Sequence, residues 1–128
     1  MGERYLIDTN ITIYFLDGFL PDAARNWVLN VLNTSSNLSV ITKIELLSKP
    51  GDVGQESTLG TFLNNSNIYS LNDQIVDTTI EIRRKYKLKL PDAVIAATAI
   101  VHQFVLVTRN TKDFTPIKDL KIINPFEI

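Results

Sequence analysis

The sequence predicts an α/β fold built around a parallel β-sheet. Short runs rich in β-branched and aromatic residues alternate with longer stretches of helical periodicity, which is typical of parallel strands joined by helices. One of these runs, residues 104–107 (Phe-Val-Leu-Val), is apolar throughout. A continuous apolar run predicts a central strand that is covered on both faces.

The first half of the chain is predicted to contain two strands and four helices. A strand over residues 4–7 precedes a helix over residues 9–17, which Gly18 ends. Pro21 is expected to open the next helix, because the missing N–H of proline costs nothing in a first helical turn. The remaining ranges are 21–33 for this helix, 38–41 for the second strand, and 42–47 and 55–64 for two further helices.

The second half is predicted to contain three strands and two helices. A strand over residues 68–71 precedes a long helix that Asn72 caps and that runs to about residue 87. Pro91 opens a helix to residue 102 or 103, and a final strand at 120–123 follows the run at 104–107. The apolar face of the long helix is predicted, from its 3.6-residue period, to comprise Ile75, Val76, Thr79, Ile80, Arg83 and Tyr86.

Length and composition exclude several classes of protein. With 128 residues, the chain is expected to form a single domain over residues 1–128. Lys and Arg number 13 against 14 Asp and Glu, a formal net charge of -1, which excludes binding of nucleic acid by bulk positive charge alone. The absence of cysteine excludes disulfide scaffolds, Cys-ligated zinc and thiol nucleophiles. No apolar stretch approaches the ~20 residues of a membrane helix, so we expect a cytoplasmic protein with no membrane partner.

Acidic side chains follow several of the predicted strands. Asp8 ends the first strand, Glu45 lies one turn into the helix after the second, and Asn110 and Asp113 follow the run at 104–107. Ligands of an open parallel sheet bind beyond the carboxyl ends of its strands, so these three junctions are expected to share one edge. Asp92 lies in the first turn of a helix that follows another helix, and the pattern alone does not place it at that edge.

Each of these acids also has a purely structural interpretation. Asp8 is a good N-cap residue, Thr42-x-x-Glu45 has the form of a capping box, Asp92 suits the positive end of a helix dipole, and Asp113 suits a turn. Their joint placement favours function, because crowded carboxylates repel one another unless a cation or protons intervene. Oxygen ligands without cysteine or clustered histidine suit Mg²⁺ or Mn²⁺, which serve phosphoryl chemistry.

Four segments resemble the motifs of a known family. They are residues 5–10 (YLIDTN), 41–47 (ITKIELL), 90–99 (LPDAVIAATA) and 107–114 (VTRNTKDF), and the ending at 123–126 (INPF) is similar as well. In this order and spacing, the chain resembles PIN-domain ribonucleases, specifically the VapC-type toxins of type II toxin–antitoxin systems. The resemblance implies a three-layer sandwich, in which a central parallel sheet of about five strands has helices on both faces.

The resemblance also implies an endoribonuclease that hydrolyses RNA phosphodiester bonds with Mg²⁺ or Mn²⁺. Asp8 and Asp92 would hold the metal, Glu45 would orient or deprotonate the attacking water, and the fourth position falls on Asn110 or Asp113. Since an amide brings no charge, the number of metal ions stays open. The residues implied in catalysis are Asp8, Glu45, Asp92, Thr108, Asn110 and Asp113, of which Asp8, Glu45, Asp92 and Asp113 would be metal ligands. Thr108 is expected to place its hydroxyl at the scissile phosphate.

Basic residues gather in the last third of the chain. Beside an acidic metal centre they are expected to bind the RNA backbone, although lysine and arginine also favour solvated helix ends. The residues concerned are Arg83, Arg84, Lys85, Lys87, Lys89, Arg109 and Lys112.

The helical region from residue 15 to residue 32 is apolar on more than one face. It indicates either a buried helical hairpin or a protein-binding surface. The resemblance implies a homodimer that is held inactive by a small antitoxin lying across a helical groove. The sole histidine, His102, is expected to have a structural or surface role.

Other functions are open at this point. An inactive PIN-like domain that only binds RNA or a protein is the alternative; Asn110 favours it, and the retained Asp8, Glu45 and Asp92 count against it. A receiver-like domain would need an adjacent acidic pair near the first strand. A phosphatase with an aspartate nucleophile would need Asp-x-Asp, whereas Asn10 stands at that position.

Overall fold

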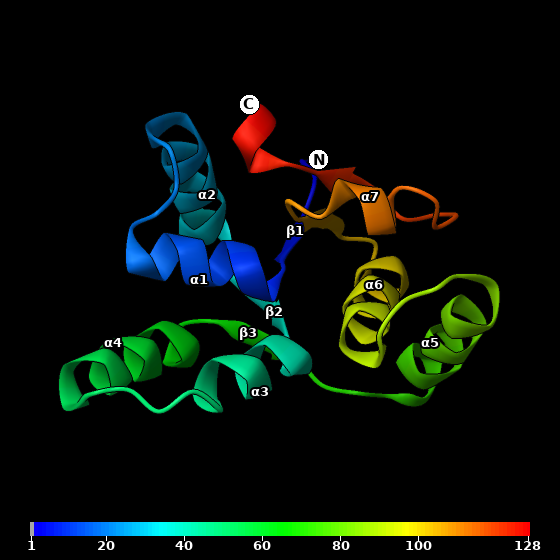
Figure 1. The fold of residues 1–128 in the computed structure, drawn as a ribbon, viewed down its shortest axis with the longest axis horizontal. Helices are drawn as coiled ribbons and strands as arrows, with labels where there is room; N and C mark the ends of the chain where they lie inside the picture. Colours follow the sequence, from blue (N-terminus) through cyan, green and yellow to red (C-terminus); the bar gives the residue numbers. More distant parts are fainter. Residues whose placement is uncertain (1) are drawn as a thin grey trace.

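Five short strands run through the centre of the molecule, and helices cover both sides of them (Figure 1). The computed structural model describes residues 2–128. In chain order the elements are β1 (Tyr5–Ile7), α1 (Thr9–Asp17), α2 (Asp22–Thr34), β2 (Asn37–Ser39), α3 (Val40–Leu47), α4 (Val53–Asn64), β3 (Asn67–Tyr69), α5 (Asp73–Lys85), α6 (Leu90–His102), β4 (Val105–Val107), α7 (Thr111–Phe114), β5 (Ile122–Ile123) and the 3₁₀ turn η1 (Pro125–Glu127).

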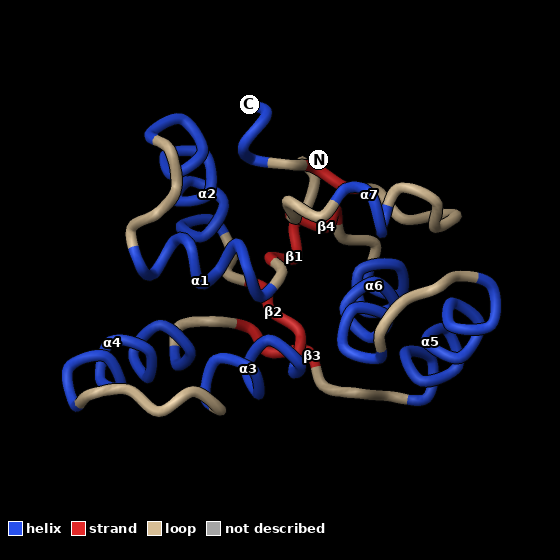
Figure 2. The backbone as a smooth tube through the Cα atoms, in the orientation of Figure 1, coloured by secondary structure: helices blue, strands red, loops and turns tan. Residues whose placement is uncertain are grey.

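All strand pairs are parallel, as predicted, and the α/β sandwich is confirmed. The five strands do not form one continuous ladder, however. Hydrogen bonds join β1, β4 and β5 into one sheet and β2 and β3 into a second, and the two sheets meet where β1 contacts β2 (Figure 2). A side chain takes the place of the ladder at this junction, since the Asn37 amide Nδ2 donates to the Tyr5 carbonyl at 3.0 Å.

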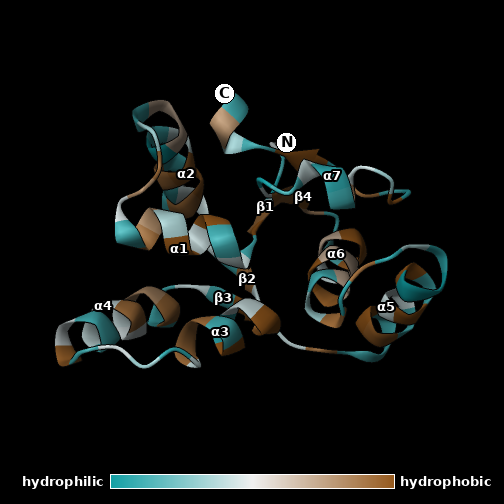
Figure 3. Cartoon of the chain, viewed as in Figure 1, coloured by the Kyte–Doolittle hydropathy of each residue, from teal (hydrophilic) through white to brown (hydrophobic). Residues whose placement is uncertain are grey.

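The core lies in two clusters, one on each side of the strands. Leu6 pairs in register with Leu106, and both pack into the cluster covered by α5 and α6. Ile7 pairs with Val107, and both pack into the cluster covered by α1 and α2. Successive residues of a strand point to opposite faces, so an uninterrupted apolar sequence fills both clusters (Figure 3).

Several helix ends follow the sequence prediction. Asp8 is the N-cap of α1 and accepts a hydrogen bond from the Ile11 N–H, and Asn72 caps α5 in the same way. Gly18 ends α1 with φ of 75°, a left-handed conformation that favours glycine. Within residues 2–128, no helix has the length and apolar character needed to span a membrane.

Three predictions about the helices were wrong. The buried face of α5 is formed by Ile75, Thr79 and Ile82, whereas Val76 and Ile80 are exposed. The helix packs on α6 through a narrower stripe than the hydrophobic period predicts.

Thr42 and Glu45 do not form a capping box. Helix α3 begins two residues earlier than predicted, at Val40, and Ser39 is its N-cap. Thr42 is therefore inside the helix, where it is wholly buried. A capping box does occur at the start of α4, between Asp52 and Gln55.

The short helix α7 and the turn η1 were not predicted. A four-residue helix and a three-residue turn are too short to show a period in the sequence. Both elements matter for the site described below.

Candidate active site

Asp8 lies at the carboxyl end of β1, where the chain turns into α1. One carboxylate oxygen accepts from the Ile11 N–H at 2.9 Å, and the Thr108 side chain forms a second hydrogen bond with the carboxylate. Only 7% of Asp8 is exposed. The residue thus has the capping role that its position predicts, and it also projects a buried carboxylate at the edge of the sheet.

Glu45 is held by a chain of two threonine hydroxyls. The Thr9 hydroxyl donates to Glu45 Oε1 at 2.7 Å and lies 2.9 Å from the Thr42 hydroxyl. A hydroxyl has one hydrogen, so when Thr9 donates to Glu45 it must accept from Thr42. Sequence reasoning missed Thr9, although its position directly after Asp8 and that of Thr42 one turn before Glu45 were available signals.

Asp92 lies in the first turn of α6, directly after Pro91, and is half-buried. The sequence pattern left its location open. The structure brings it to the same edge as the other acids, because the charges of Glu45 and Asp113 act on Asp92, and the charge of Asp92 acts on Asp8.

The two candidates for the fourth position, Asn110 and Asp113, are hydrogen-bonded to each other. Asn110 is the N-cap of α7; its Oδ1 accepts from the Asp113 N–H at 3.4 Å, and its Nδ2 donates to Asp113 Oδ2 at 3.0 Å. Asp113 is exposed and its charge acts on Asp92. In this arrangement Asn110 orients Asp113 and Asp113 brings the charge.

The expectation that Thr108 presents its hydroxyl to the scissile phosphate is wrong for this arrangement. Thr108 is wholly buried. Its hydroxyl accepts from the Asn110 N–H at 3.0 Å and bonds to the Asp8 carboxylate. It links the two halves of the site and does not face solvent.

The site is short of positive charge. Burial raises the pKa of Asp8 to about 6, and the charges of Asp92 and Glu45 raise it further, whereas the bonds from Thr108 and Ile11 lower it. Burial also raises the pKa of Asp92, with added contributions from Glu45 and Asp113 and a weaker opposing one from Lys89. Carboxylates in this state favour a bound cation or proton.

The chemistry of these side chains fits a hard divalent cation, since the donors are carboxylate and amide oxygens. Within the described part of the chain, no three acidic or histidine side chains are gathered at metal-ligand spacing. Mg²⁺ is commonly held by only one or two carboxylates and keeps several waters, so this spacing accords with such an ion. Asp8 and Asp92 are the two most enclosed carboxylates available to it.

The predicted basic residues divide into two groups. Arg83, Arg84 and Lys85 end α5, and Lys89 is the N-cap of α6, where its charge acts on Asp92. Arg109 is separate from them. It lies between Thr108 and Asn110, and its guanidinium carbon is 4.1 Å from the centroid of the Phe126 ring.

The remaining members, Lys87 and Lys112, are exposed, in the loop before α6 and in α7 respectively. No contact with the acidic residues is recorded for them. His102 packs against Tyr69, with ring centroids 4.6 Å apart, and its carbonyl accepts from Arg4, as expected of a structural residue.

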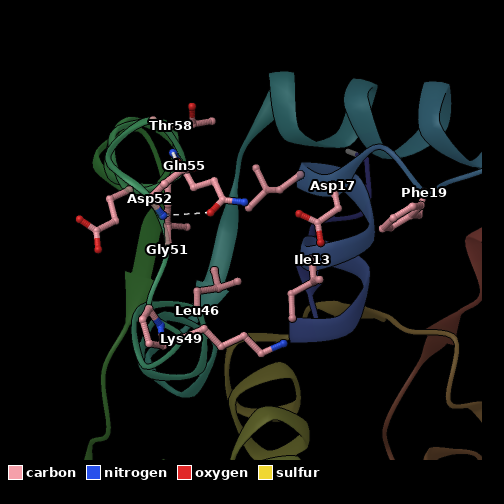
Figure 4. Close-up of a pocket in the computed structure, with 14 residues that line it drawn as sticks. Ile13, Asp17, Phe19, Leu46, Lys49, Gly51, Asp52, Gln55 and Thr58 are labelled. Carbon is pink, nitrogen blue, oxygen red and sulfur yellow. Dashed lines mark hydrogen bonds between the residues drawn. The ribbon is translucent and has the colours of Figure 1, made fainter.

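A cavity of about 760 Å³ lies between α1 and the segment that joins α3 to α4 (Figure 4). Ile13, Leu16 and Phe19 line one wall, and Leu46 and Leu59 are among the residues opposite. Both interpretations of the apolar region hold in part: Leu20, Val28 and Val31 are buried, whereas Phe19 is 71% exposed.

Comparison with known proteins assigns the family. A model of the PIN domain matches residues 5–119. The chain belongs to the PIN-domain family. The comparison with curated proteins gave no match.

Solved structures with this PIN fold are toxin–antitoxin complexes. A toxin–antitoxin complex from Klebsiella pneumoniae contains a chain that is 35% identical, with a TM-score of 0.80, and the alignment covers 97% of this chain and 99% of that one. VapBC2 from Rickettsia felis, bound to a promoter DNA fragment, is 25% identical with a TM-score of 0.79, covering 94% and 97%.

DNA-bound VapBC from Salmonella typhimurium has the same fold, with 20% identity, a TM-score of 0.82 and coverage of 97% and 99%. The resemblance to VapC-type PIN toxins that the sequence motifs predicted is thereby confirmed.

Proposed function

We propose that this PIN-domain protein is a Mg²⁺- or Mn²⁺-dependent endoribonuclease that acts as the toxin of a toxin–antitoxin pair. The observation that carries the proposal is the convergence of Asp8, Glu45 and Asp92 at one edge of the sheet. Their mutual repulsion and the burial of Asp8 favour a bound cation.

Each side chain has a role in this proposal. Asp8 and Asp92 hold the cation, and Asp113, which Asn110 orients, completes its surroundings. Glu45 accepts the proton of the attacking water or orients that water, because Thr9 engages Oε1 and leaves Oε2 available. When bound, the cation supplies water activation and stabilises charge on the phosphate.

The test compares the wild-type protein with Asp8→Asn and Asp92→Asn, using Mn²⁺-dependent cleavage of RNA and the melting temperature. We expect cleavage to fall on the order of 100-fold or more. Mn²⁺ should raise the melting temperature of the wild type, because it binds the folded state, and should do so much less for the variants. Asp52→Asn is the matched control, since Asp52 is an aspartate N-cap on the exposed helix α4.

Other outcomes contradict the proposal. If the variants melt earlier and still cleave, the acids are helix caps and not a metal site. If the wild type binds RNA or a protein partner but does not cleave RNA with either metal, the alternative of an inactive PIN-like binding domain holds.

We also propose that the cavity beside α1 receives a segment of the antitoxin. Its apolar wall includes the exposed Phe19, and its rim carries Asp17, Lys49 and Asp52, so the matching segment would combine apolar and charged side chains. Phe19→Ser should weaken binding of the cognate antitoxin in a pull-down while leaving RNA cleavage by the free protein unchanged.

A further inference from the structure

We propose that Arg109 binds a backbone phosphate of the RNA strand beside the cleavage position, and that Phe126 is the positioning residue that holds its guanidinium there. This inference rests on the function proposed above. It goes beyond it by assigning a phosphate contact outside the acidic cluster and a role for the C-terminal turn.

The backbone on both sides of Arg109 is tied to the acidic site. Thr108 bonds to the Asp8 carboxylate, and the Asn110 N–H donates to the Thr108 hydroxyl at 3.0 Å. Asn110 in turn orients Asp113. Arg109 itself is exposed, so its side chain leaves from the edge of the site toward solvent.

The Phe126 ring is fixed by two other elements. It makes an edge-to-face contact with Tyr14 of α1, with centroids 5.8 Å apart and planes at 80°. The Phe126 N–H donates to Asn124 Oδ1 at 2.9 Å, and the neighbouring Pro125 is buried. The ring therefore provides a rigid surface at 4.1 Å from the guanidinium carbon of Arg109.

Stacking of this kind leaves the guanidinium able to bind an anion. The ring contacts the flat face of the group, whereas the five N–H donors point outward within its plane, where they can bind phosphate bidentately. Arg4 provides a contrast within the same chain. Its guanidinium also lies over an aromatic ring, that of Phe104, but its Nη2 donates to the His102 carbonyl at 2.7 Å.

The charge of Arg109 is also not used to neutralise the site. Among the groups that act on Asp8 and Asp92 in the described part of the chain, the one basic side chain is Lys89, and it acts on Asp92. A cation this close in sequence to the acidic residues that does not pair with them remains available to an incoming anion. At a site that cleaves phosphodiesters, the anion present is a phosphate of the substrate strand.

The test measures binding and cleavage of a single-stranded RNA oligonucleotide. Binding is followed by fluorescence anisotropy in an Asp8→Asn background with Mg²⁺, over a range of salt concentrations. Arg109→Ala should weaken binding about 3- to 10-fold and reduce the slope of log affinity against log salt by about 0.7, the value for one phosphate contact on a single strand. In the cleaving protein it should raise KM several-fold with little change in kcat.

The role of Phe126 is tested by pairing variants. Phe126→Leu removes the aromatic face and should weaken RNA binding about 2- to 5-fold, whereas Phe126→Tyr should restore it. Combined with Arg109→Ala, Phe126→Leu should cause no further loss, because it acts through Arg109. Arg25→Ala is the matched control: Arg25 is an exposed arginine near the ring of Phe15, and its removal should leave the salt slope unchanged.

Two results would overturn the inference. One is an Arg109→Ala variant that keeps the wild-type salt slope and affinity, including the case in which it loses only binding to a protein partner. The other is an additive effect of Phe126→Leu, which would make the ring a structural residue only. If the wild type fails to cleave RNA at all, the proposed function fails, and the salt slope still decides whether Arg109 contacts phosphate.

Discussion

Asp8 combines two opposing effects in one side chain. As the N-cap of α1 it satisfies the Ile11 N–H, which stabilises the helix. As a buried carboxylate beside Asp92 and Glu45 it is destabilised in its ionised form. Asparagine keeps the first effect and removes the second, so the two can be separated by experiment.

We predict that Asp8→Asn stabilises the protein above pH 6 in the absence of divalent metal. The pKa of Asp8 is raised from 3.8 to about 6, so between these values the folded protein keeps a proton that the unfolded chain has released. The wild-type free energy of unfolding should therefore fall by on the order of 3 kcal/mol as pH rises through this window. Denaturant titrations in EDTA from pH 3.5 to 7.5 measure it.

The Asp8→Asn variant should lack most of this pH dependence. Asp52→Asn should retain it, because Asp52 caps an exposed helix far along the chain from the acidic residues. A wild type whose stability does not fall between pH 4 and 6 would contradict the assignment of a destabilised carboxylate to Asp8.

A second residue-scale prediction concerns Thr9. Thr9→Val keeps the shape of the side chain but removes the hydroxyl that engages Glu45 Oε1, so we expect RNA cleavage to fall roughly 10-fold. Thr9→Ser should restore most of the activity. Single-turnover kinetics and melting temperatures of both variants measure the effect, and equal activity of the two would show that the hydroxyl does not position Glu45.

At the scale of elements, the junction between the two sheets depends on Asn37. This side chain is 2% exposed; its Nδ2 donates to the Tyr5 carbonyl, and its Oδ1 accepts from Asn67. It thereby joins β1 to β2 where backbone hydrogen bonds are missing. Because Asp8 follows β1 and α3 follows β2, this junction also sets the position of Asp8 relative to Glu45.

We predict that Asn37→Ala lowers the free energy of unfolding by roughly 2 to 3 kcal/mol, since it leaves buried polar groups unpaired. Asn65→Ala is the control, because Asn65 also bonds a carbonyl but is exposed, and it should change stability by less than about 1 kcal/mol. Urea titration at pH 7 measures both. A similar effect of the two substitutions would mean that the junction does not depend on the Asn37 side chain.

At the scale of the whole molecule, the exposed apolar residues of α5 need an explanation. Val76 and Ile80 lie one turn apart and are 41% and 46% exposed. We propose that this surface contributes to the homodimer that the family resemblance implies. Association of two copies would cover it.

The expected outcome is that Ile80→Glu shifts the protein toward monomer in sedimentation velocity at micromolar concentration, with the melting temperature of the monomer unchanged. Glu81→Lys, a substitution at the neighbouring exposed position, is the control for a change of charge. A wild type that sediments as a monomer would contradict the proposal.

The sequence by itself determined the type of fold and the order of its elements. Alternation of apolar runs and helical periods, the N-caps Asp8 and Asn72, and Gly18 at a helix end are local signals that depend on neighbouring residues only. The motifs around Asp8, Glu45 and Asp92 likewise indicated the family, which the PIN-domain match confirms.

The tertiary structure decided what local signals cannot encode. It buried Ile82 in place of Val76 and Ile80, because the angle at which α5 packs on α6 selects the contact stripe. It split the strands into two sheets around Asn37, buried the Thr108 hydroxyl, and placed Phe126 against Arg109. Each of these depends on contacts between residues far apart in sequence, and only the packed chain brings such residues together.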